Sequence, residues 1–448
     1  MPRLVDIANE RRDQLTLTSC SWLSEAMNQK GLVKGGIYLL SGAPGAGKTT
    51  LALQVAVDLA AQGHLIVYVA LEQSTHDLKD IVDGRIYKQM RGQPSKMKSS
   101  ALPLKEGLEE VRKQQQAEEA FEQKIGKVNS NLYIEDSLGS IEALQDFLIR
   151  RVTRGELKET ALIIVDSLQG TGLASGSTGV YKKVYEFANN CKALKIPVVL
   201  IGHVTKAGAI AGPRTLEHNV DCVLYLRKAM RLRPLFVPKN RFGAERHEPR
   251  ILTMNSMGCL EPAKHETATA RLAYGMLRNM DRPVEVQVAV KLPRFGERAQ
   301  IKAPYLPTKV VSQIVEIVGG LHDIDLSEMQ FDINCAIPGG RAFSRILDFP
   351  LAMSMLSSYM QMPIPSGSLF VGELDLFRNI RALESNDVSA LSALLGAGRV
   401  SHIKHLYLEP ETALELKAIS DGLGKIEIHE VHTLEDVVSK MWPDIVEG

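Results

Sequence analysis

The segment from Gly42 to Thr49 constrains the chain most, because it has the pattern G-x-x-x-x-G-K-T and reads Gly42, Ala43, Pro44, Gly45, Ala46, Gly47, Lys48 and Thr49. An apolar run precedes it at 37–40, and a helix-forming segment follows from Thr50. In this pattern glycines let backbone N–H groups surround phosphate oxygens at a helix N-terminus. The lysine reaches the β- and γ-phosphates, and the threonine hydroxyl binds Mg²⁺. We therefore predict that residues 42–50 bind ATP with Mg²⁺ and that Lys48 acts in catalysis.

The composition is that of a globular protein with reduced thiols. The chain has 448 residues, 45% of them hydrophobic, and a formal net charge of +1. This length predicts two or three domains, and the balanced charge predicts no global attraction to nucleic acid or membranes. Five scattered cysteines without a C-x-x-C pair argue against disulfides and against a cysteine zinc site. Because we find no signal peptide and no membrane-spanning apolar run, we expect a cytoplasmic protein.

The order of apolar and helical segments predicts two folded parts. Residues 1–34 lead into an α/β domain over 35–262, in which strands and helices alternate as in a parallel sheet with right-handed crossovers. Within it, residues 77–128 are rich in charge and carry apolar residues at helical spacing. We interpret them as inserted, exposed helices with a solvated face, or alternatively with a nucleic-acid or partner surface. A linker over 263–282 then precedes an α+β domain over 283–448.

Two carboxylates occupy the positions where a P-loop enzyme needs them. Asp166 ends the apolar run 162–165, and would hold Mg²⁺ opposite Thr49. Glu72 follows the strand after the phosphate-loop helix, where a carboxylate can orient the attacking water and accept its proton. The alternatives are a helix-capping aspartate and a surface glutamate. We favour the catalytic interpretation for both residues.

Several basic residues and one histidine follow the later strands. His203 ends the strand 198–202, where it would sense the γ-phosphate or serve only a structural role. The small, flexible loop behind it carries Lys206 and Arg214, which suit sequence-independent contact with a phosphate backbone. Lys239 and Arg241 are one residue apart and project to the same side of an extended segment. They would neutralise charge at a neighbouring subunit's nucleotide, or form a solvated basic turn.

These segments resemble the RadA (Sms) family of bacterial DNA-repair ATPases. The string Lys-Asn-Arg-Phe-Gly at 239–243 is highly specific to that family. Three further segments match this family: 69–74 with Glu72, 165–169 with Asp166, and 201–214 with His203 and the loop behind it. The segment with Glu72 is also similar to DnaB-type helicases. The second domain is similar to the Lon-protease-like domain of the same family, at 371–374 and 380–383. The resemblance covers residues 20–448.

The resemblance implies an α/β, RecA-like P-loop ATPase core followed by an α+β Lon-protease-like domain. It implies a homo-oligomer, a hexameric ring on single-stranded or branched DNA, that drives branch migration or translocation in recombination and repair. Recombinases or helicases would be its protein partners. Carried over by position, Lys239 and Arg241 act on the neighbour's ATP. Lys206 and Arg214 face the central channel.

The chain departs from the family pattern in three places. The family's N-terminal four-cysteine zinc module has no counterpart, since only Cys20 precedes the phosphate loop. Residues 77–128 are longer than the family pattern. The Ser–Lys dyad of Lon proteases is missing, because the serine position aligns near Ile346 and no lysine lies between Arg381 and Arg399. A serine without a base is not an activated nucleophile, so we predict a non-proteolytic scaffold for assembly and DNA binding.

Two other functions stay open from the sequence. One is an ATP-dependent Lon-like serine protease, against which the missing lysine argues. The other is a nucleotide-switched assembly protein without DNA activity, built from a RecA fold as circadian rings are. The missing zinc module and the long helical segment are compatible with the second.

Overall fold

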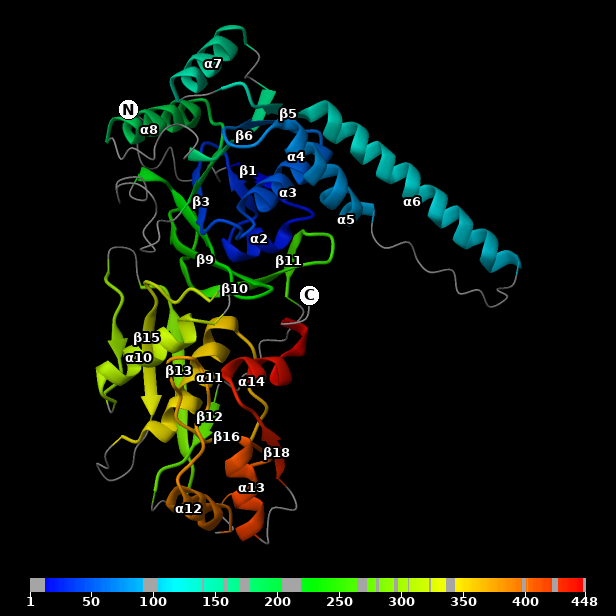
Figure 1. Cartoon of the computed structure of the whole chain (residues 1–448). Helices are drawn as coiled ribbons and strands as arrows, with labels where there is room; N and C mark the ends of the chain where they lie inside the picture. The colour runs from blue at the N-terminus through cyan, green and yellow to red at the C-terminus, as the bar shows by residue number, and fades with distance from the viewer. Residues whose placement is uncertain are drawn as a thin grey trace, which may run out of the picture. The chain divides into compact units, whose positions relative to one another are not determined.

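The computed structural model describes fifteen stretches of the chain, and the structural statements below concern these residues: 13–91, 104–138, 141–155, 159–168, 178–203, 219–263, 272–278, 282–293, 297–304, 306–321, 324–335, 343–396, 400, 402–420 and 426–445. The chain divides into two compact units (Figure 1). The first unit comprises Met1–Leu226, Leu235–Arg246 and Met254–Pro262. The second unit comprises Arg227–Pro234, His247–Thr253 and Ala263–Gly448. Most of the nine-stranded sheet belongs to the first unit, and the seven-stranded sheet belongs to the second.

The larger sheet has nine strands, and its centre is parallel as predicted. In spatial order the strands are β11 (Leu260–Pro262), β10 (Arg246–Met254), β9 (Leu232–Asn240), β8 (Cys222–Leu226), β3 (Ile37–Gly42), β7 (Val198–His203), β6 (Thr160–Asp166), β4 (Leu65–Ala70) and β5 (Leu132–Glu135). From β8 to β5 all neighbours run parallel, whereas β9 runs antiparallel to β8. The non-sequential order requires crossovers, which helices provide.

Helices cover the sheet because its central strands are buried on both faces. The helical elements of the first unit are α2 (Ser21–Ala26), α3 (Lys48–Ala61), α4 (Thr75–Ile81), the π-helical turn η1 (Val82–Ile86), α5 (Tyr87–Arg91), α6 (Leu104–Asn131), α7 (Ile141–Thr153) and α8 (Thr178–Ala193). Leu144 of α7 and Phe187 of α8 pack into one apolar cluster with Leu39 and Ile163 of the sheet. An aliphatic strand such as β3 therefore contacts helices rather than water.

The described part of the N-terminal lead-in folds as a piece of the first unit. Strands β1 (Gln14–Thr16) and β2 (Gly31–Val33) form a two-stranded antiparallel sheet. The buried carboxylate of Asp58, on α3, accepts hydrogen bonds from the backbone N–H groups of Thr18, Ser19 and Cys20 at 2.8, 3.0 and 3.1 Å. A buried charge needs such donors. The lead-in is thereby fixed to the helix that follows the phosphate loop.

Helices do occupy the insertion-like segment. Figure 1 shows α6 extending away from the sheet as one long helix. Its described side chains are mostly exposed, and Val128 is the buried one near its C-terminal end. Arg91 of α5 pairs with Glu118, and the Tyr87 hydroxyl lies 3.1 Å from Asn129 Oδ1. Polar contacts therefore join α5 to α6 along a mainly solvated surface.

The second unit is built on a mixed, seven-stranded sheet. In spatial order its strands are β14 (Ile301–Lys302), β15 (Gln330–Cys335), β13 (Val284–Lys291), β12 (Leu272–Gly275), β16 (Ser368–Phe370), β17 (His405–Leu408) and β18 (Glu427–Glu430). Strand β13 is antiparallel to both its neighbours, whereas β16, β17 and β18 are parallel. Buried and exposed residues alternate along β13, as expected for a strand with one solvated face.

The predicted linker over 263–282 is wrong where β12 lies. Residues 272–275 form a central strand of the second sheet, and Ala273 of this strand is completely buried. The predicted boundary at 262 is also too simple, since residues 227–234 and 247–253 belong to the second unit. A four-residue strand gives too short an alternation to be distinguished from a loop.

One buried helix organises the second unit. The helical elements are α10 (Thr308–Gly319), the 3₁₀ turn η6 (Arg345–Leu347), α11 (Asp348–Met360), α12 (Ser385–Gly396), α13 (Pro410–Ile419), α14 (Leu434–Met441) and the 3₁₀ turn η7 (Pro443–Ile445). Every residue of α11 is buried. Its Ser354 and Ser358 hydroxyls accept hydrogen bonds from the N–H groups of Val288 and Val290 at 3.1 and 2.9 Å. The two serines thus provide hydrogen-bond acceptors for the backbone N–H groups of β13 that lie beyond the end of the neighbouring strand β12.

A buried ion pair begins α11. Asp348 is 0% exposed, and Arg345 Nε donates to its Oδ2 at 2.6 Å. Burial raises the pKa of this carboxyl to about 7, although the guanidinium of Arg345 opposes the rise. Since the pKa is higher in the folded than in the unfolded chain, the contribution of protonated Asp348 to stability is fully present below the unfolded pKa. It is lost as the pH rises through about 7.

We expect the substitution Asp348→Asn to flatten this pH dependence. Between about pH 5 and pH 6.5 the free energy of unfolding of the wild type should fall relative to the variant by roughly 1.4 kcal/mol per pH unit. Urea unfolding at several pH values measures the difference. Asp444→Asn, at an exposed position of the same unit, is the control and should run parallel to the wild type. Parallel profiles for Asp348→Asn would contradict the assignment.

Candidate nucleotide-binding site

The residues predicted to bind nucleotide meet at the carboxyl edge of the parallel strands. Gly42 ends β3 and pairs in register with His203 at the end of β7. Asp166 ends β6 and pairs with Ala70 at the end of β4. His203 therefore has the predicted position in the backbone, while its side chain lies outside the described part of the structure. This edge is where parallel α/β sheets bind their ligands.

The phosphate loop has the shape that its glycines permit. A Cβ atom on Gly42 would lie 2.1 Å from the carbonyl oxygen of Leu226, so only glycine fits there. Gly47, immediately before α3, has a φ of 102°, which L side chains rarely adopt. Pro44 and Gly45 are exposed at the tip of the loop, and Ala46 is buried beneath it. The helix then starts at Lys48, so its first N–H groups face the loop.

Lys48 is held inside the loop. Its side chain is 5% exposed, and Nζ donates to the carbonyl oxygens of Gly42 and Ala43, both at 2.9 Å. Burial lowers its pKa to about 8, while the charges of Asp166 and Glu72 act in the opposite direction. A cation packed against a glycine loop and a helix N-terminus fits the phosphates of a nucleotide.

Thr49 and Asp166 are brought together as the Mg²⁺ prediction requires. The Thr49 hydroxyl and the Tyr68 hydroxyl both hydrogen-bond to the Asp166 carboxylate, Tyr68 at 2.6 Å. Burial raises the pKa of Asp166, and these two hydrogen bonds oppose the rise. Hydroxyl and carboxylate oxygens are ligands that Mg²⁺ prefers, so the residues fit this ion. The sequence analysis did not identify Tyr68 as part of this site. The one sequence signal for its role is that it is an aromatic residue within an otherwise aliphatic strand.

Glu72 lies beside this pair and is itself oriented. Its Oε1 accepts a hydrogen bond of 2.5 Å from the Ser167 hydroxyl, and its side chain is exposed. The backbone N–H of Leu71 donates to the carbonyl oxygen of Asp166 at 2.6 Å, which joins the two strand ends. Ser167 is a second residue that sequence reasoning missed. Its role follows from the fold, because only the pairing of β4 with β6 places it next to Glu72.

Arg241 lies at the opposite edge of the same sheet. The Asp221 carboxylate accepts from the N–H of Ile37, the first residue of β3, at 3.1 Å, and lies 3.4 Å from Arg241 Nη1. The backbone N–H of Arg241 also donates to the Asp221 carbonyl oxygen at 2.8 Å. Because β3 spans Ile37–Gly42, about 17 Å separates this edge from the phosphate loop. Arg241 therefore does not serve the nucleotide site of its own chain.

The motif around Arg241 shapes a turn that presents this side chain. Asn240 Nδ2 donates to the carbonyl oxygen of Met27 at 2.7 Å, and the Phe242 ring lies 5.9 Å from the Tyr38 ring. The Arg241 side chain is 55% exposed and borders a surface hollow of about 1010 Å³. Lys239 differs from the prediction in one respect, since it is only 7% exposed.

Some predicted features lie elsewhere or cannot be placed. Lys206 and Arg214 lie outside the described residues. All five cysteines are buried, and none forms a disulfide. No helix in the described ranges is both long and apolar enough to cross a membrane.

Known proteins resemble this chain over most of its length. DNA repair protein RadA of Campylobacter jejuni is 29% identical over 377 residues, which cover 80% of this chain and 72% of that protein. DNA repair protein RadA of Listeria monocytogenes is 25% identical over 432 residues, covering 92% and 81%. A KaiC-like protein from Pyrococcus horikoshii OT3 aligns with a TM-score of 0.39 at 16% identity, covering 56% of this chain and 99% of that structure.

These matches confirm the resemblance to RadA that the sequence motifs indicated. A family model described as "ATPase: KaiC" matches residues 18–256, which contain the phosphate loop, Glu72, Asp166 and Arg241. The predicted RecA-like α/β ATPase fold is confirmed by this match together with the parallel sheet. Since the match spans more than half of the 448 residues, the chain belongs to the KaiC ATPase family.

Proposed function

We propose that this chain is an ATP-driven, DNA-binding motor of the RadA type, acting in recombination and DNA repair. The observation that carries the proposal is the division of its catalytic groups between two edges of one sheet. A phosphate loop with its carboxylates occupies the carboxyl edge, and an exposed arginine occupies the other. The names of the curated relatives, DNA repair protein RadA, supply the biological setting.

The groups at the carboxyl edge suit hydrolysis of ATP. Lys48 stabilises the phosphates, and Glu72 orients the attacking water and accepts its proton. Thr49 and Asp166 would hold Mg²⁺, and the bound ion would supply positive charge against the phosphates. Ser167 positions Glu72 through their hydrogen bond. His203, at the end of the neighbouring strand, couples the nucleotide to the loop behind it.

The exposed arginine completes the site of a neighbouring subunit. Arg241 lies about 17 Å from its own phosphate loop, along the length of β3. A head-to-tail arrangement of identical subunits brings such an edge against the next subunit's nucleotide, and it closes into a ring. We assign contact with the neighbour's phosphates to Arg241. Lys239, near the end of β9, is buried and adds positive charge close to this turn in the chain. We propose a hexameric ring, as the RadA resemblance implies.

The loop after β7 provides the proposed contact with DNA. Lys206 and Arg214 would face the central channel and grip single-stranded or branched DNA through its phosphates. Such contacts carry no sequence information, which suits branch migration or translocation. Recombinases or helicases are the proposed protein partners.

The second unit is proposed to be a Lon-like scaffold without protease activity. Ile346, which aligns near the nucleophilic serine of Lon proteases, is buried in the apolar cluster of this unit. The nearby Ser344 hydroxyl accepts a hydrogen bond from the backbone N–H of Ile346, as a cap of η6. An apolar side chain at the nucleophile position supplies no covalent chemistry.

Hydrolysis of ATP by purified protein, with and without single-stranded or forked DNA, tests the motor directly. We expect DNA to stimulate the wild type several-fold and the substitution Lys48→Ala to abolish turnover. Lys206→Ala with Arg214→Ala should remove the stimulation and keep the basal rate. Lys79→Ala, at an exposed lysine of the same unit, is the control and should behave as wild type.

Two results would overturn this proposal. Full ATPase activity of Lys48→Ala would exclude the assigned site. Nucleotide-dependent oligomerisation with no response of the ATPase to any DNA would favour the assembly protein instead, and degradation of casein would favour the protease.

The position of Arg241 predicts that its removal affects the hydrolysis of ATP much more than the binding of ATP. Arg241→Ala should bind a fluorescent ATP analogue within about threefold of the wild type, because the residue lies far from its own phosphate loop. Its kcat should fall by about 1,000-fold, as on removal of an arginine finger. Arg91→Ala, at an exposed arginine of the same unit, should change neither quantity. Equal turnover of Arg241→Ala and wild type would contradict the trans role.

A further inference from the structure

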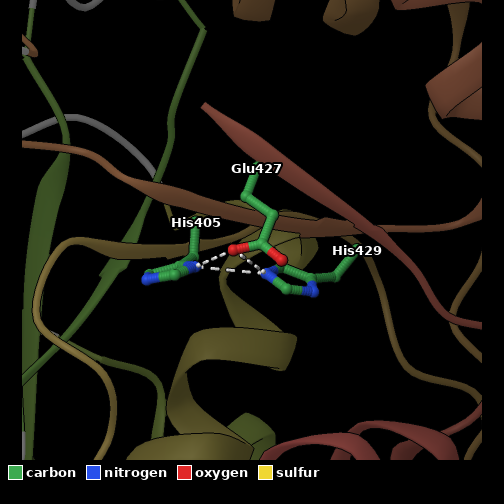
Figure 2. A group of neighbouring side chains, drawn as sticks. All are labelled: His405, Glu427 and His429. Atoms are coloured by element: carbon green, nitrogen blue, oxygen red, sulfur yellow. Dashed lines mark hydrogen bonds and ion pairs between the residues drawn. The ribbon is translucent and has the colours of Figure 1, made fainter. Parts of the chain in front are cut away.

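Three side chains of the second unit converge on one point at the edge of its sheet. Strands β17 and β18 run parallel, with His405 in register with Glu427 and Tyr407 in register with His429. Glu427 and His429 are two residues apart, so they project from the same face of β18. Figure 2 shows both of them pointing toward His405 across the strand boundary. No residue of this group belongs to the nucleotide site.

The separations of the three donor atoms match those of a metal site. His405 Nδ1 lies 3.2 Å from His429 Nε2 and 3.2 Å from Glu427 Oε2. His429 Nε2 lies 3.7 Å from Glu427 Oε2. In a tetrahedral zinc site with ligands at about 2.0–2.1 Å, neighbouring ligand atoms are about 3.3–3.4 Å apart. The cluster is therefore close to this geometry without any rearrangement of its strands.

We propose that His405, Glu427 and His429 bind one divalent transition-metal ion of the zinc class. Two imidazole nitrogens and one carboxylate oxygen suit zinc, whereas Mg²⁺ and Ca²⁺ prefer oxygen ligands alone. Three protein ligands leave the fourth tetrahedral position to water. Glu427 is 66% exposed, which gives the ion access from solvent.

Neighbouring aromatic rings fix the ring of one proposed ligand, His429, in place. The His429 ring stacks on Tyr407 at 4.4 Å with 12° between the planes, and Tyr407 stacks on Phe370 at 4.8 Å. Packing of this kind around a ligand raises metal affinity by orienting the ring.

The place of the cluster in the sheet indicates what the metal does. Strand β18 is the edge strand, and β17 is its one neighbour in the described sheet. An ion held by His405 on one strand and by Glu427 and His429 on the other links the two strands through their side chains. Binding that occurs only in the folded state stabilises the fold. The metal would therefore secure the edge of the second unit.

Titration of the full chain with zinc tests the proposal. The protein, freed of any affinity tag, is treated with a chelator, desalted and titrated with Zn²⁺ against a chromophoric competitor. We expect one equivalent of tightly bound zinc, a higher Tm with zinc, and the visible absorption of tetrahedral Co²⁺ when cobalt replaces it. His405→Ala and His429→Ala should each weaken binding at least about tenfold.

Two further variants test whether a loss of zinc binding is specific to the proposed ligands. His432→Ala changes an exposed histidine just beyond β18 and should bind zinc as the wild type does. Glu427→Gln preserves size at an exposed position and should weaken binding even if a histidine variant fails to fold. The proposal is overturned if the wild type binds no tight equivalent of zinc. It is equally overturned if folded His405→Ala and Glu427→Gln bind zinc as tightly as the wild type.

Discussion

The buried carboxylate of Asp221 connects the two halves of the proposed catalytic apparatus. It accepts hydrogen bonds from the N–H of Ile37 at 3.1 Å and from Lys192 Nζ at 2.9 Å, and it pairs with Arg241. A carboxylate with a side chain only 3% exposed requires such partners, because burial of an uncompensated charge is very costly. The start of β3, the end of α8 and the turn that carries Arg241 are thereby held at one place.

As a consequence, the distance between the turn that carries Arg241 and the phosphate loop is fixed. Strand β3 begins at the Asp221 cluster and ends in the phosphate loop, so the strand itself acts as the spacer. Both edges are rigid, since β3 lies between two parallel neighbours and all its residues are buried. The proposed phosphate site and the exposed arginine therefore lie at opposite ends of this strand. In the proposed ring, a neighbouring subunit brings its arginine to the phosphate site.

Sequence patterns predicted the parts of the site that depend on strand ends. Lys48, Thr49, Asp166 and Glu72 follow aliphatic runs, and the ends of parallel strands gather at one edge whatever the loops do. Tyr68 and Ser167 could not be predicted in this way, because their roles arise from which strand lies beside which. The pairing of β4 with β6 is a tertiary fact.

The errors have equally physical causes. The attachment of the lead-in to α3 could not be predicted, because nothing local shows that Asp58, forty residues away from Thr18, accepts its hydrogen bonds. Strand β12 was predicted as part of a linker, because a strand of four residues shows too little alternation of apolar and polar residues to be recognised. Lys239 and Arg241 are one residue apart, so the sequence alone predicts the same side of an extended segment for both. Their different burial depends on the neighbouring strand and turn.

Complementation between two inactive variants measures the central claim, that each active site is shared by two subunits. Glu72→Gln removes the proposed catalytic carboxylate and keeps Arg241, whereas Arg241→Ala does the reverse. Mixed rings contain sites with an intact phosphate edge from one variant and an intact arginine from the other. Equal mixing of the two should restore up to about a quarter of wild-type ATPase activity. Activity no greater than the sum of the two separate variants, in rings shown to contain both, would contradict the account.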